Sequence, residues 1–142
     1  MANLIPNTPP LSGLLNALLE LIQQGRQQAL RAVDRVQVQT CWEIGRHIVE
    51  FEQGGQARAA YGKKLLPRLA ESLTREFGKG FDDRNLRNMR AFYQVFPIWH
   101  SVRTELSWTH YRALLRVSHK EAREWYVHEA ASQNWSARAL DR

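Results

Sequence analysis

The sequence predicts an all-α fold, a helical bundle that contains a helix-turn-helix. Apolar residues recur at helical spacing along nearly the whole chain, and the period-two alternation typical of strands is absent. Glycine, proline and capping residues separate the apolar segments. The length of 142 residues suits one domain, so we expect a single domain over 11–142 after a loose terminus at 1–10, which includes Pro9 and Pro10.

The first half of the chain predicts three helices. A leucine-rich helix is expected over Leu11–Gln24, followed after Gly25 by a long second helix over Arg26–Gln53, which Gly54 and Gly55 would end. The expected core stripe of this long helix is Val33, Val36, Thr40, Ile44, Ile48 and Phe51. A third helix covers Lys63–Phe77, with its regular part starting nearer Leu66 because of Pro67, and buries Leu65, Leu66, Leu69, Ala70 and Leu73.

The second half predicts four more helices. One covers Asp83–Phe96, capped by Asp82 or Asp83 and stopped by Pro97. Shorter helices follow over Trp108–Arg116 and His119–Ser132, and a last one begins at Ser136 as N-cap. Since the chain ends barely two turns later, we interpret it as the N-terminal piece of a longer protein, with this last helix truncated.

Composition excludes several classes of site. The single cysteine, Cys41, excludes an intrachain disulfide and a cysteine-rich zinc site, and no two of the five histidines have helical metal-ligand spacing. We expect Cys41 to be buried packing. No signal peptide is recognisable, and Leu11–Ile22 is too short to span a bilayer. We therefore expect a soluble, cytoplasmic protein without membrane partners, metal or cofactor.

Positive charge is concentrated in one part of the chain. The net charge is +6, and residues 61–100 carry eight Lys or Arg against four acids, whereas residues 1–60 are balanced. Such an excess indicates a polyanion partner, with a solvated basic face as the alternative.

The helix-turn-helix outline over Leu65–Phe96 has a basic second helix. Leu86, Met89, Phe92, Tyr93 and Phe96 fall on one side as the core face. The candidate DNA-binding residues are Arg84, Asn85, Arg87, Asn88 and Arg90 on the outer side, with Lys63, Lys64 and Lys79 as flanking phosphate contacts.

Two other stretches invite a functional interpretation. Trp108 and Tyr111 could stack on a base and His110 could touch phosphate, but packing is the expectation we favour for the aromatic pair. Asp82 and Asp83 could hold a metal, but their place before a helix favours capping.

Several runs resemble the bacterial YhcG-like family. They are GFDDRNLRNMRAFY at Gly80–Tyr93, Tyr61-Gly62-Lys63, LSWTHYRALL at Leu106–Leu115, and the surroundings of Trp125-Tyr126 and Trp135-Ser136, and the resemblance covers Leu14 to Arg142. It implies a winged-helix-like, DNA-binding N-terminal domain that precedes a nuclease domain of the PD-(D/E)XK type, absent from this chain.

No nuclease site is expected in the chain itself. The residues two positions before the four lysines are Tyr61, Gly62, Phe77 and Ser118, so no (D/E)-x-K exists, and Mg²⁺ is expected only in the absent nuclease domain. We expect a non-enzymatic module that positions duplex DNA. The alternative is a helical dimerisation or protein-interaction module, with a homodimer formed through Leu11–Ile22 and the long second helix.

Overall fold

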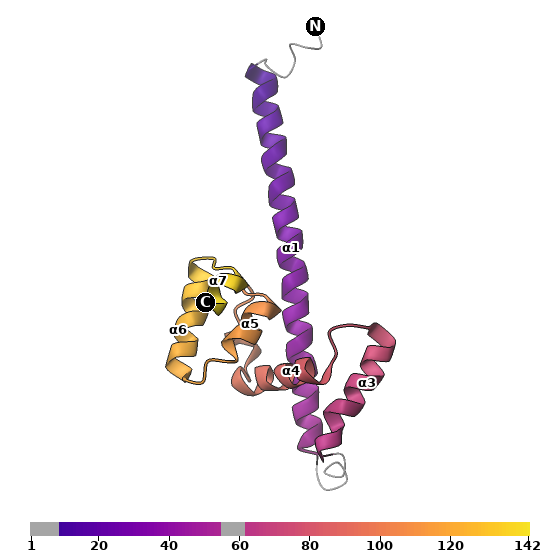
Figure 1. The fold of residues 1–142 in the computed structure, drawn as a ribbon. Helices are drawn as coiled ribbons and strands as arrows, with labels where there is room; N and C mark the ends of the chain where they lie inside the picture. Colours follow the sequence, from indigo (N-terminus) through magenta and orange to yellow (C-terminus); the bar gives the residue numbers. More distant parts are fainter. Residues whose placement is uncertain (1–8, 55–61) are drawn as a thin grey trace. The chain divides into compact units, whose positions relative to one another are not determined.

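The computed structural model describes residues 9–54 and 62–142, and these residues form helices without any strand (Figure 1). The α-helices are α1 (Pro9–Glu52), α3 (Leu65–Phe77), α4 (Asp83–Val95), α5 (Trp108–Leu114), α6 (Lys120–Ser132) and α7 (Ala137–Asp141), with short 3-10 helices η2 (Gly62–Lys64) and η3 (Trp99–Ser101). The all-α prediction is therefore confirmed. Of the terminus expected to be loose, residues 1–8 lie outside the described residues, as do Gly55 and Tyr61.

The prediction of two helices separated near Gly25 is wrong, because α1 continues through this glycine. A glycine inside a helix costs about 1 kcal/mol relative to alanine. Its neighbours Gln23, Gln24, Arg26 and Gln27 are good helix formers, so the penalty is not enough to end the helix. Residue contacts divide the chain after Val33 into two units, 1–33 and 34–142.

In the second unit, the buried face of α1 matches the predicted stripe only in part, at Ile48, which is buried, and at Ile44, which packs against the core. Val36 is 62% exposed and Thr40 is exposed, whereas Val38 is fully buried. The other buried apolar residues of this helix are Cys41, Trp42, Ile48 and Val49. Gly45 lies in the middle of this face, and a Cβ atom there would stand 2.1 Å from the carbonyl oxygen of Met89 in α4. The close crossing of α1 and α4 at Gly45 thus selects which face of α1 is buried.

Helices α3 and α4 form the expected pair with a glycine turn between them. Gly78 and Gly80 both have positive φ, at 83° and 103°, a conformation that side-chain-bearing residues rarely adopt. The Asp82 side chain accepts a hydrogen bond from the Asn85 backbone N–H at 3.0 Å, which confirms Asp82 as the N-cap of α4. The predicted core faces of both helices are confirmed: their residues are buried or packed against the core.

The remaining helices complete the core of the second unit. Tyr111 is fully buried, and its hydroxyl accepts from the Arg103 backbone N–H (2.7 Å) and donates to the Arg103 carbonyl (2.9 Å). The Trp42 indole donates to the carbonyl of Phe96 at 2.7 Å and so joins α1 to the end of α4. Ser136 caps α7, as predicted.

The described helices include none whose length and apolar character would let it cross a membrane. The wing of a winged helix is a β-hairpin, and residues 9–54 and 62–142 form none. The winged-helix-like detail is therefore not confirmed.

Candidate nucleic-acid interface

A basic groove of about 630 Å³ lies where α4, α5 and α7 meet in the second unit. It is lined by polar and charged side chains, with two alanines: Asp82, Arg84, Asn85, Asn88, Thr109, Arg112, Ala113, Arg116, Ala137, Arg138 and Asp141. Four arginines face two aspartates, so the groove is net positive.

The first wall of the groove is the N-terminal part of α4, which Asn85 attaches to α5. The Asn85 side-chain amide donates to the carbonyl of Gly80 (2.5 Å), and its Oδ1 accepts from the buried Trp108 indole (3.2 Å). These bonds fix the start of α4, and with it the positions of Arg84 and Asn88. The favoured packing role of Trp108 is confirmed.

The second and third walls, α5 and α7, are joined by His110. Its Nδ1 accepts from the Ser107 backbone N–H (3.0 Å), and its Nε2 lies 2.7 Å from the carbonyl oxygen of Trp135. This pattern assigns the ring proton to Nε2, which donates to Trp135. Because Ser136 caps α7 directly after Trp135, His110 sets where α7 begins and where Arg138 lies.

The acidic residues of the groove already have partners, whereas most of its arginines have no acidic one. Asp82 caps α4, and Asp141 forms an ion pair with the exposed Arg116. Over the ranges 9–54 and 62–142, no carboxylate lies within ion-pair distance of the exposed Arg84, Arg112 or Arg138. Three guanidinium groups without a carboxylate partner therefore line one groove.

The candidate DNA-binding residues of α4 lie on two different sides of that helix. Arg84 and Asn88 line the groove, whereas Arg87 and Arg90 line a different hollow. Arg87 pairs with Asp83 at 2.5 Å, and Arg90 pairs with Glu52 of α1 at 2.9 Å. Asn85 has its side chain engaged in the bonds that hold α4, as described above.

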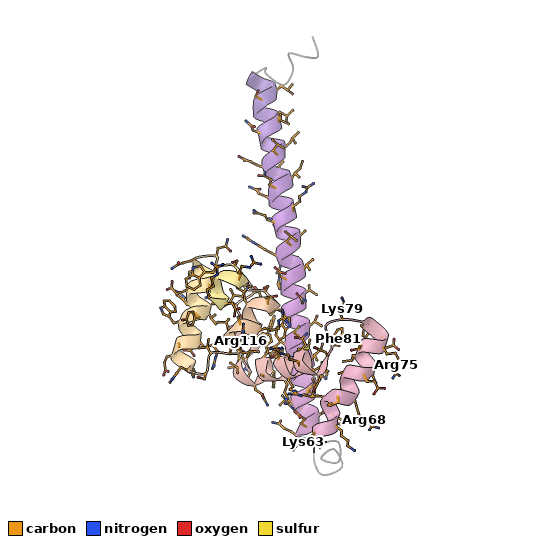
Figure 2. The ribbon with its side chains drawn as sticks, in the orientation of Figure 1. Lys63, Arg68, Arg75, Lys79, Phe81 and Arg116 are labelled. Atoms are coloured by element: carbon orange, nitrogen blue, oxygen red, sulfur yellow. The ribbon has the colours of Figure 1, made fainter. Side chains whose placement is uncertain are left out.

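The predicted flanking lysines lie beyond the two ends of α3. Lys63 and Lys64 belong to η2 just before α3, and Lys79 lies in the turn after it; all three are exposed. Figure 2 shows Lys63 and Lys79 beside opposite ends of α3 and Arg116 away from that helix, beside α5. Thirteen helical residues span about 20 Å, so Lys79 lies far from the neighbouring pair Lys63 and Lys64.

Sequence reasoning missed the cations that complete the groove: Arg112, Arg116 and Arg138. One signal was available, since Thr109, Arg112 and Arg116 recur at the spacing of one helical face. That this face meets α4 and α7 could not be inferred from the spacing.

Cys41 is not placed for chemistry. Burial raises the pKa of its thiol to about 12, and the positive charge of Arg112 only partly offsets this. Its buried position confirms the packing prediction. In the described part of the chain, no group of three His, Cys, Asp or Glu side chains could hold a metal ion.

Comparisons with known proteins identify the family. Residues 17–142 match the model of the DUF1016 N-terminal domain. An Escherichia coli (strain K12) protein described as "Putative nuclease YhcG" is 33% identical over 159 aligned positions, which cover 89% of this chain. The chain spans 42% of that relative's length. No solved structure shows a significant match. The chain therefore belongs to the DUF1016 N-terminal domain family and is a YhcG-like N-terminal domain.

Proposed function

We propose that residues 34–142 bind duplex DNA through the groove between α4, α5 and α7. The observation that carries the proposal is the set of three exposed arginines without a carboxylate partner, Arg84, Arg112 and Arg138, gathered from three helices. Arginine forms bidentate hydrogen bonds with phosphate and is the residue most suited to such contacts.

The groove combines phosphate contacts with a group that can read a base. Asn88 lines the groove one helical turn after Arg84, and an asparagine amide can pair with adenine. In this proposal α3, the glycine turn and α4 act as a helix-turn-helix in which the start of α4 faces DNA, and no wing is needed.

We propose that DNA cleavage is carried out by a part of a longer protein that lies outside these 142 residues. The longer relative is described as a "Putative nuclease", and we propose that this domain positions DNA and that Mg²⁺-dependent cleavage takes place outside it. We accordingly expect the 142-residue chain to leave plasmid DNA uncut in Mg²⁺. We also expect it to act as a DNA-binding module in the cytoplasm. Cleavage abolished by one point mutation in this chain would contradict that assignment.

The test compares two triple variants that remove equal charge. One replaces Arg84, Arg112 and Arg138 with glutamine; the control replaces Lys63, Lys64 and Lys79 with glutamine. Binding to a fluorescently labelled duplex is measured by anisotropy between about 50 and 200 mM salt. Each lost phosphate contact should lower the slope of log affinity against log salt by roughly 0.9.

We expect the arginine variant to lose most of the salt dependence and about a hundredfold in affinity, since each of the three lost contacts costs on the order of 1 kcal/mol. The lysine variant should bind nearly as the unmodified chain does. Equal losses in both variants would indicate diffuse charge rather than a groove. Unchanged binding by the arginine variant, or no binding by the unmodified chain at low salt, would refute the proposal.

A further inference from the structure

The first unit presents an apolar helical face to solvent. Every residue from Gly13 to Arg31 in α1 is exposed, although this segment contains leucines at a density typical of a core. The large side chains on one face are between 45% and 65% exposed: Leu14, Leu15, Leu18, Leu19, Leu21, Ile22 and Val33. Helices in proteins are stabilised mainly by packing of such a face, and Gly13 and Gly25 lower the intrinsic stability of this one.

The centre of this face follows the spacing of a two-helix coiled coil. Leu15, Leu18, Ile22, Gly25, Ala29 and Ala32 are separated alternately by three and four residues, which places them along one seam. Large residues occupy the first half of the seam, and the second half contains only glycine and alanine. The seam itself carries no charge, and Arg26 is the one charged residue at its edge.

We propose that this face binds the same face of a second copy of the chain, with the two helices antiparallel. A two-fold axis between Gln23 and Gln24 would place Leu15 opposite the partner's Ala32, Leu18 opposite the partner's Ala29, and Ile22 opposite the partner's Gly25. Every layer then joins one large and one small residue, so the spacing between helix axes stays uniform. This proposal is independent of the DNA-binding groove.

A parallel pair would lack this complementarity. It would set leucine against leucine in the first half and alanine or glycine against itself in the second, and no single axial separation suits both halves. The antiparallel arrangement also opposes the two helix dipoles favourably. A helix whose large residues precede its small ones is complementary to its own reverse, which favours a second copy over an unrelated partner.

The available area suits a stable dimer. A half-exposed leucine-sized side chain offers roughly 80 Å² of apolar surface. The seven large side chains therefore offer about 560 Å² in each copy, or on the order of 1,100 Å² in the two copies together. The seam alanines, Gly25 and the stems of Arg26 and Gln28 add to this, so the interface reaches the lower limit of about 1,200 Å² for specific interfaces.

The oligomeric state of the 142-residue chain, measured by analytical ultracentrifugation, tests whether this face of α1 forms a dimer. Leu18→Asp puts a charge into the middle of the seam, whereas the control Leu30→Asp changes a residue that is 67% exposed and lies off the seam. We expect a dimer for the unmodified chain and for Leu30→Asp. For Leu18→Asp we expect the dissociation constant of the dimer to rise at least about a hundredfold. A monomer at all concentrations, or equal effects of the two substitutions, would overturn the proposal.

Disulfide trapping tests the orientation without destabilising charge. In the antiparallel pair, residue 15 lies opposite the partner's residue 32 and 17 residues, about 25 Å, from the partner's residue 15. A mixture of Leu15→Cys and Ala32→Cys chains should therefore cross-link, and Leu15→Cys alone should not. The native Cys41 is buried and does not compete. Cross-linking of Leu15→Cys chains to one another would show a parallel pair and overturn the proposed arrangement.

Discussion

Replacing Gly45 with alanine should destabilise the second unit because the backbone of α4 leaves no room for a Cβ atom there. The added Cβ would lie 2.1 Å from the Met89 carbonyl oxygen, 2.8 Å from the Met89 carbonyl carbon and 3.1 Å from the Tyr93 Cβ. The two shortest contacts involve the backbone of a helix, which cannot rotate away as a side chain can. The substitution therefore has to move α4 away from α1.

Overpacking of this kind costs about 1–3 kcal/mol, and a backbone clash belongs in the upper half of that range. For a unit of this size, each kcal/mol lowers Tm by roughly 4 °C, so we expect Tm to fall by about 8–12 °C. Thermal unfolding followed by circular dichroism measures this. The matched control is Gly13→Ala in the same helix, where nothing lies within 4 Å of the added atom. It should keep or slightly raise helix stability.

The same shift should weaken DNA binding, since α4 carries Arg84 and Asn88 into the groove. Tm unchanged to within about 2 °C in Gly45→Ala, or an equal fall in Gly13→Ala, would show that the α1–α4 crossing is not the constraint inferred here.

Three further predictions concern single side chains. Burial raises the pKa of the Cys41 thiol from 9.0 to about 12, so the unfolded chain loses this proton at lower pH than the folded chain does. The free energy of unfolding should therefore fall as pH rises above 9, by about 1.4 kcal/mol per pH unit. Urea titrations at pH 8 to 10 should show this loss in the native chain and not in Cys41→Ala. Asp82→Asn keeps a good N-cap but removes a negative charge from the groove, so DNA should bind more tightly at unchanged Tm, while Asp82→Ala should cost about 1 kcal/mol of stability. Tyr111→Phe leaves the Arg103 backbone N–H without its partner and should cost about 1–3 kcal/mol in chemical unfolding; a loss below about 0.5 kcal/mol would contradict the burial of that bond.

Local features of the fold could be predicted from the sequence. The helical segments, the cap residues Asp82 and Ser136, the glycine turn after Phe77 and the core face of α4 all depend on residues within a few positions of one another. The apolar character of Leu11–Ile22 is likewise local. The helix break predicted at Gly25 is wrong because glycine penalises a helix without ending it when good helix formers surround it.

The candidate site could be predicted only in part. Arg84 and Asn88 were among the expected residues, and their structural neighbours Arg112 and Arg138 were not. Arg87 and Asp83 are four residues apart on one helix, so their ion pair could be predicted from the sequence spacing. The pair between Arg90 and Glu52 joins residues 38 positions apart and could not be read from spacing.

The sequence by itself determined where helices form and which family the chain belongs to, because helix propensity, capping and periodicity act over one or two turns. The tertiary structure alone decided which face of α1 is buried and which arginines share a groove. Both depend on contacts between distant segments: the approach of α4 to Gly45, and the bonds from Asn85 to Trp108 and from His110 to Trp135. The periodicity of a helix indicates in which direction a side chain points from the helix axis. Which residues it then contacts depends on how the helix packs against other helices.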